Sequence, residues 1–212
     1  MMGRRYLLPG TTLIELLLFI ALLGVVGATT VPLLYWYTKN RVLQQTISIV
    51  EQNGAQVLQN IALRVHQAEK ILVPAQGTEG TVAAFQTGSG TTNPTILGTL
   101  SGTIVIIRGT VKETLSSGQV AVQNFRIRNT SVSPTRQSTH VSFTLSKTVR
   151  LQQPFSYIQY FEGAFTLLPD TTPQGNLCGC TPPYCKGNNI YEWRVCESDG
   201  TCSTATTPLQ CP

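Results

Sequence analysis

Side chains able to catalyse a reaction are scarce in this chain. It has two histidines, His66 and His140, and ten acidic residues among 212. Glu162 and Asp170 have no neighbouring acid with which to work as a general acid and base. No G-x-S-x-G, P-loop or HExxH pattern occurs. The sequence therefore predicts a protein that is not an enzyme, and no cofactor or metal is expected.

The six cysteines form a second chemical group, and all of them follow residue 177. Their spacing, C-x-C-x4-C-x10-C-x5-C-x8-C, lacks the paired C-x2-C knuckles that are usual in zinc sites. An even number in a Pro- and Gly-rich segment favours disulfides in an oxidising compartment, with the pairing left open. The segment is either a tip or adhesive module or a stapled, protease-resistant C-terminus. The candidate disulfide residues are Cys178, Cys180, Cys185, Cys196, Cys202 and Cys211.

Basic residues dominate the middle of the chain, where no acid lies between Glu113 and Glu162. A basic stripe could contact nucleic acid. However, Arg126 and Arg128 fall on the polar face of a predicted strand, where sheets display solvated charge. Solvated charge is therefore the favoured interpretation, and nucleic acid is the less favoured partner.

The composition indicates where these residues are displayed. The formal net charge is +5 and the pI is near 9.0, yet only 12% of residues are charged, against about a quarter in typical domains. The exposed surface must then consist largely of Ser, Thr, Gln and Asn. Such a surface favours an exported protein over a cytosolic enzyme.

Residues 13–34 are apolar except for Glu15, two glycines and Thr29–Thr30. At about 1.5 Å per residue, a helix of this length spans a hydrocarbon core about 30 Å thick. Arg4 and Arg5 precede it, which places the N-terminus in the cytoplasm. A cleaved signal peptide would leave an exposed VPLLYWY segment, and a plain membrane anchor would not explain Glu15.

A basic leader that ends in Gly10, followed by TLIELL at residues 12–17, resembles the class III signal of the type IV pilin and type II secretion pseudopilin family. The resemblance implies that prepilin peptidase cuts between Gly10 and Thr11. Glu15 then becomes the fifth mature residue, where the family has its glutamate, and Pro32 the twenty-second, where many members have a helix-kinking proline. Thr11 stands where the family has an N-methylated phenylalanine, so Thr11 is the candidate methylation site.

The same resemblance implies a role in assembly. Glu15 would pair with the Thr11 amine of a neighbouring subunit or of its own chain, and Pro32 would bend or locally melt the helix. The chain would be a minor pilin or pseudopilin of the J or W type. Its partners would be prepilin peptidase, other pilin or pseudopilin subunits, an inner-membrane assembly platform and the lipid bilayer. It would reside in the cytoplasmic (inner) membrane and then in a cell-surface or periplasmic filament.

Helical periodicity continues beyond the membrane segment to about Ile71, and Pro74 ends it. The apolar stripe of this outer half predicts that it covers a sheet, with a close packing contact at Gly54. The stripe comprises Leu43, Ile47, Val50, Gly54, Val57, Ile61, Val65, Ala68 and Leu72.

Short strands separated by turn signals follow. We expect a surface loop over residues 75–102 with a short strand at VAAF, then strands at 103–108, 119–128, 140–151, 157–168 and 190–195, with a bulge at Gln123–Asn124. The predicted fold is α+β and pilin-like: a long N-terminal helix on an antiparallel sheet, with a disulfide-rich C-terminal extension. The predicted parts are a leader (1–10), a transmembrane half-helix (11–38), an amphipathic half-helix (39–73), a β domain (74–168) and a cysteine-rich tail (169–212).

A second function remains open from the sequence. An uncleaved helix would make the chain a single-pass, membrane-anchored, extracytoplasmic binding or adhesion module that could contact DNA. The state of the N-terminus distinguishes this alternative from a pilin-like subunit.

Overall fold

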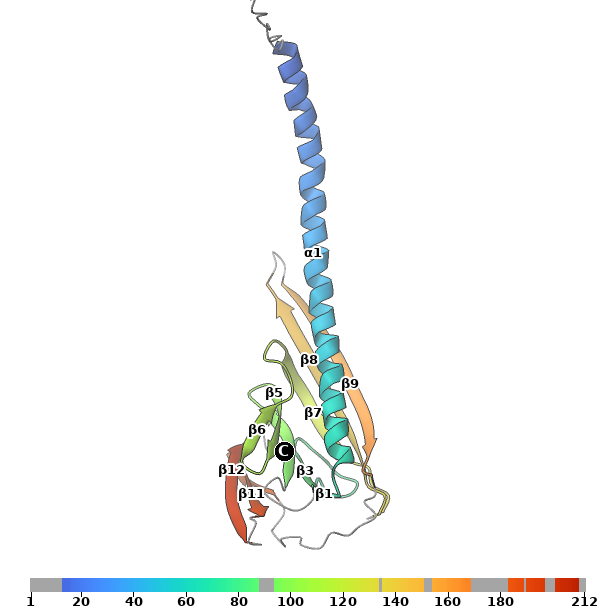
Figure 1. Cartoon of the computed structure of the whole chain (residues 1–212), viewed down its shortest axis with the longest axis vertical. Helices are drawn as coiled ribbons and strands as arrows, with labels where there is room; N and C mark the ends of the chain where they lie inside the picture. The colour runs from blue at the N-terminus through green and yellow to red at the C-terminus, as the bar shows by residue number, and fades with distance from the viewer. Residues whose placement is uncertain are drawn as a thin grey trace, which may run out of the picture. The chain divides into compact units, whose positions relative to one another are not determined.

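The computed structural model describes residues 13–87, 94–133, 135–150, 154–168, 183–188, 190–196 and 201–209. One long helix, α1 (Leu13–His66), is followed by antiparallel strands, so the predicted α+β class is confirmed (Figure 1). The chain divides between Gln45 and Thr46 into two compact units. The helix runs from the first unit into the second.

The helix ends earlier than its periodicity predicts. It stops at His66, and Lys70–Val73 forms strand β1 instead of a last helical turn. Ala68 and Ile71 are buried, as the pattern predicts, but outside the helix. The backbone N–H of Glu69 donates to the carbonyl of Gln86, which begins the pairing of this segment with a neighbouring strand. Pairing within a sheet thus overrides a weak helical preference here.

A four-stranded sheet supports the outer half of the helix. Its order is β2-β7-β8-β9, and the teal end of α1 lies across it in Figure 1. Val50, Val57, Ile61 and Val65 of the helix are fully buried in one apolar cluster with residues of this sheet. The strands are β2 (Glu79–Gly80), β7 (Ala121–Asn129), β8 (Ser138–Val149) and β9 (Phe155–Thr166).

Gly54 of the helix packs closely against Phe161 of β9. A Cβ atom at this position would overlap the ring of Phe161. The close packing predicted at Gly54 is therefore confirmed. The predicted bulge is also confirmed, because the pairing of β7 with β8 shifts between Gln123 and Arg126 and Asn124 adopts φ +51°.

A five-stranded sheet of order β1-β3-β4-β5-β6 has a core on each face. Ile104 and Ile106 of β5 point to the cluster with α1, whereas Val105 and Ile107 point to a second cluster. Burial on both faces explains the uninterrupted apolar run of this strand. The remaining strands are β3 (Ala83–Gln86), β4 (Thr95–Leu100), β5 (Thr103–Arg108) and β6 (Val111–Thr114).

The prediction of a surface loop over residues 75–102 is wrong, because β3 and most of β4 in this range are buried. The short strand predicted at VAAF is confirmed in part, as β3. A two-residue turn, Ser101–Gly102, joins β4 to β5, with φ of 50° and 74°. These values suit a hairpin turn whose twist matches its strands. The Ser-Gly pair between two apolar runs was the signal that could have identified the hairpin.

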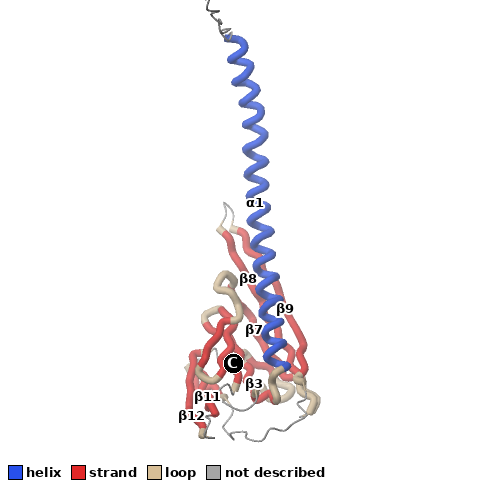
Figure 2. The backbone as a smooth tube through the Cα atoms, in the orientation of Figure 1, coloured by secondary structure: helices blue, strands red, loops and turns tan. Residues whose placement is uncertain are grey.

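The C-terminal residues add a third layer. β10 (Tyr184–Gly187), β11 (Ile190–Cys196) and β12 (Cys202–Pro208) form an antiparallel sheet, which appears with the other strands in red in Figure 2. Tyr191, Trp193 and Val195 alternate inward and pack against the outer cluster of the five-stranded sheet. The strand predicted at 190–195 is confirmed. The prediction of a single sheet is wrong, because the described strands form three sheets. Both faces of the five-stranded sheet are apolar, so another element must cover each face.

Candidate functional site

The first unit carries the segment on which the assembly hypothesis depends. Residues 13–39 of α1 are exposed except for half-buried Gly27, so no described residue covers the apolar side chains of this segment. The helix is long and apolar enough to cross a membrane. An exposed apolar surface of this size is unfavourable in water and requires lipid or other helices.

Glu15 lies in the first turn of α1 and is exposed. An acid at this end interacts favourably with the helix dipole. Among the described residues it has no hydrogen bond or ion pair. Gly10 and Thr11, the predicted cleavage and methylation positions, lie outside the described residues, so the proposed pairing with the Thr11 amine stays a prediction.

Polar groups near the middle of the apolar segment are satisfied within the helix. The Thr30 hydroxyl donates to the Val26 carbonyl at 2.8 Å, and the Thr29 hydroxyl to the same oxygen at 3.0 Å. Such bonds remove the cost of placing a hydroxyl in hydrocarbon. The helix continues without interruption through Pro32, so the predicted local melting does not occur. A kink at Pro32 stays a prediction.

The cysteines fall into two groups. Cys185, Cys196 and Cys202 lie on the three strands of the C-terminal sheet, with Cys196 opposite Cys202 in the ladder. Neither Cys185 nor Cys202 is a free thiol. Cys178, Cys180 and Cys211 lie outside the described residues. The sequence predicted a tail, whereas in the structure β10, β11 and β12 of this segment form a sheet that covers a core.

One acid of this sheet has two partners. Lys186 Nζ lies 2.9 Å from Glu192 Oε2, and the Tyr184 hydroxyl donates to Glu192 Oε1 at 2.8 Å. The Glu192 side chain is only 13% exposed. The hydrogen bonds from Lys186 and then from Tyr184 lower the pKa of the Glu192 carboxyl. The same contact with Glu192 raises the pKa of Lys186.

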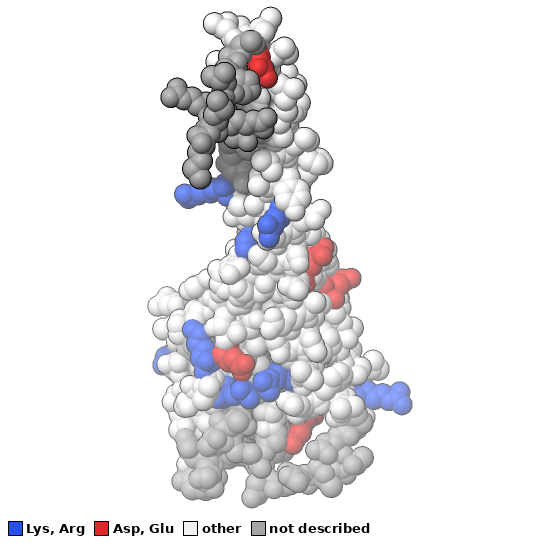
Figure 3. All heavy atoms as spheres, turned by 45° about the horizontal axis from the view of Figure 1, so that its top comes forward, with Lys and Arg blue, Asp and Glu red and all other residues white. Residues whose placement is uncertain are grey.

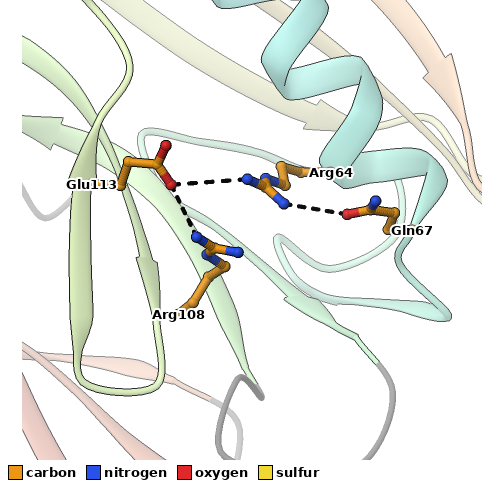
Figure 4. Close-up of polar contacts among 4 residues, drawn as sticks. All are labelled: Arg64, Gln67, Arg108 and Glu113. Carbon is orange, nitrogen blue, oxygen red and sulfur yellow. Dashed lines mark hydrogen bonds and ion pairs between the residues drawn. The ribbon is translucent and has the colours of Figure 1, made fainter.

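A charged cluster joins the end of the helix to the β5–β6 hairpin. Arg108 Nη2 and Arg64 Nη2 lie 3.1 and 3.8 Å from Glu113 Oε2, and Arg64 also donates to Gln67 Oε1 (Figure 4). These side chains are partly exposed, so the cluster contributes little stability. Figure 3 shows that charges are sparse on the face it draws.

The predicted basic stripe lies on the polar face of the four-stranded sheet. Arg126 Nη1 pairs with Glu79 Oε1 at 3.2 Å, and Arg128 is exposed beside His140 in the next strand. The position of both arginines agrees with the expectation of solvated charge. Binding of nucleic acid stays untested and is not favoured.

The histidines lie apart from each other. His66 is exposed in the last turn of the helix. His140 Nε2 lies 3.7 Å from Glu162 Oε2, a cross-strand contact that the sequence analysis missed. The register of β8 and β9 creates this contact, and the sequence alone offers no signal for that register. Within the described part of the chain, no group of three or more His, Cys, Asp and Glu residues could hold a metal.

Comparisons with known protein families, with curated proteins and with solved structures each find no match to this chain.

Proposed function

We propose that this chain is a minor pilin or pseudopilin, a membrane-stored structural subunit that assembles into a type IV pilus or a type II secretion-like filament. The observation that carries the proposal is the common register of Gly10, Glu15 and Pro32 in and around one apolar segment. An exposed apolar helix that continues into an amphipathic helix packed on a sheet supports it. Its length and elaborate strand region favour the J or W type.

The mechanism follows from charge in a low-dielectric environment. Cleavage after Gly10 creates a cationic amine at the membrane boundary. Pairing with Glu15 of a neighbouring helix removes the penalty of two isolated charges and fixes one axial register. The chain carries no nucleotide-binding motif, so the energy for extraction from the membrane comes from the assembly machine.

Sequencing the N-terminus of the membrane-extracted protein tests the proposal. We expect a mature chain that starts at Thr11. Gly10→Val should block cleavage, whereas Gly3→Val in the leader should leave it unchanged. A native chain that keeps Met1 or Met2 would overturn the proposal and favour the anchored binding module.

A second test addresses Glu15. Glu15→Leu and Glu15→Gln should leave membrane insertion intact, because each removes a charge from an apolar segment. Both should impair co-purification with partner pilin subunits. If the variants co-purify with as much partner pilin as the native chain, the pairing mechanism is contradicted. That result would not affect the test of cleavage after Gly10.

The C-terminal sheet completes the proposal. We infer that its cysteines form disulfides after export, which would make β10–β12 a stapled outer sheet of an extracytoplasmic domain. The domain would face the periplasm or the cell surface, since Arg4 and Arg5 keep the opposite end in the cytoplasm.

A further inference from the structure

Two cations follow the aromatic residues at the end of the apolar segment of α1. Tyr35, Trp36 and Tyr37 end this segment, and Lys39 and Arg41 come shortly after them. Trp36 and Tyr37 are 65% and 63% exposed, and both cations are exposed as well. All five residues belong to the first unit and to one continuous helix. Together they form the collar of α1.

The positive charge of the collar has no partner close by. Among the described residues, neither Lys39 nor Arg41 makes a hydrogen bond or an ion pair. The nearest acids in the sequence are Glu15 and Glu51. Along the helix, Glu51 lies about 15 Å from Arg41, and Glu15 lies about 36 Å from Lys39. Both separations exceed the Debye length of about 8 Å at physiological ionic strength, so neither acid neutralises the collar.

The two cations lie on opposite sides of the helix. At about 100° per residue, Lys39 and Arg41 are about 200° apart around the helix axis. Each follows a tyrosine by four residues and therefore shares its side of the helix, Lys39 with Tyr35 and Arg41 with Tyr37. A flat protein surface approaches a helix from one side and could contact only one of these cations. A lipid bilayer surrounds a spanning helix and contacts both.

The spacing of the collar along the helix axis fits the layers of a bilayer. Residues 13–34 match the thickness of the hydrocarbon core, and aromatic side chains prefer the boundary between this core and the headgroups. Lys39 and Arg41 lie about 6 Å beyond Tyr35 and Tyr37, or roughly one helical turn. The headgroup layer of one leaflet is about 5–8 Å thick. Both cations therefore reach the depth of the lipid phosphates.

We propose that the collar binds the phosphate groups of anionic phospholipids. Lys39 and Arg41 donate to lipid phosphates on opposite sides of the helix, while the aromatic rings lie at the boundary of the hydrocarbon core. A zwitterionic headgroup carries the same phosphate together with a cation, so the net charge favours the anionic class. The proposal requires a helix in a membrane, but it requires neither cleavage after Gly10 nor filament assembly.

Quenching of Trp36 fluorescence by brominated lipids tests the proposal with the full chain in phosphatidylcholine vesicles. Brominated phosphatidylglycerol should associate with the helix about fivefold more strongly than brominated phosphatidylcholine at low salt, the ratio expected for one cation at an anionic surface. Trp193, the other tryptophan, is buried in the second unit and adds a constant background. At about 1 M salt the Debye length is about 3 Å, so most of the preference should disappear.

A double variant of the collar should also remove the preference. In Lys39→Gln with Arg41→Gln, both positions are exposed and glutamine has a helix propensity similar to that of lysine and arginine, so the helix should remain intact. The control is Lys70→Gln with Lys112→Gln, which removes two exposed cations from β1 and β6. The control should keep the preference of the native chain.

Three results would overturn the proposal. The first is equal quenching by the two brominated lipids at low salt. The second is a preference that survives the loss of both collar cations, or that the control variant loses to the same extent. The third is a preference that stays unchanged at about 1 M salt, and this measurement needs only the native chain.

Discussion

Gly54 shows how one residue controls the packing of the helix on its sheet. The Phe161 ring occupies the space that a side chain at position 54 would need. That ring stacks on Phe143 at a centroid distance of 5.5 Å, and Phe143 is fully buried. The ring therefore has little room to retreat, and only glycine permits this approach.

Gly54→Ala should destabilise the second unit. Alanine gains about 1 kcal/mol in helix propensity, but overpacking against a ring held from behind should exceed that gain and leave a net loss of about 1–3 kcal/mol. Chemical denaturation measures the difference. Gly118→Ala, whose Cβ would meet nothing within 4 Å, is the control. Combining Gly54→Ala with Phe161→Leu should recover part of the loss, and no recovery would contradict the contact.

Glu192 makes the stability of the C-terminal sheet depend on pH. Its pKa is lower in the folded protein than the ordinary value of 4.5. The resulting stabilisation is present above the unfolded pKa and is lost as the pH falls through the folded pKa. The thermal midpoint should therefore fall more on acidification from about pH 5 to about pH 3 in the native chain than in Glu192→Gln. Lys186→Met should shrink this difference, and parallel curves would contradict the prediction.

At the scale of elements, strands with one exposed face could be predicted from the sequence. The five-stranded sheet, which is covered on both faces, was harder to predict. β8 and β9 alternate between inner and outer positions, and both were predicted close to their observed bounds. β4 was missed because its Thr and Gly residues resemble a loop, although its neighbours bury most of it. Local composition does not predict whether elements distant in sequence will bury a strand.

Reduction should loosen the three-stranded sheet specifically. Cys185 and Cys202 are not free thiols, and loss of a disulfide in a small element typically costs about 2–5 kcal/mol. Trp193 is 3% exposed, so its emission should shift to longer wavelength at lower denaturant after treatment with a reducing agent. Trp36→Phe leaves Trp193 as the single tryptophan and makes the signal specific. An unchanged midpoint after reduction would contradict a stapling role.

For the whole molecule, the distribution of apolar surface matters most. The second unit contains two buried apolar clusters. In the first unit, residues such as Leu18, Phe19 and Trp36 are more than 60% exposed. The surfaces of the two units therefore suit different surroundings, because the exposed apolar side chains of the first unit are unfavourable in water.

The full chain should remain in the membrane pellet after washing with alkaline carbonate or concentrated salt, because burial of residues 13–34 in lipid is hydrophobic rather than ionic. A chain that begins at Thr46 should appear in the soluble fraction, since it lacks this exposed surface. Immunoblotting of the two fractions measures both. Release of the full chain by salt alone would contradict a membrane-spanning helix.

The sequence by itself determined the apolar segment with Glu15, the alternating strands and the close approach at Gly54, because local periodicity and residue size encode these features. The tertiary structure decided where the helix ends, that most of β4 is buried, and that strands from the cysteine-rich end form a third sheet over a core. These features depend on pairing and burial between residues far apart in the chain, which local patterns do not specify.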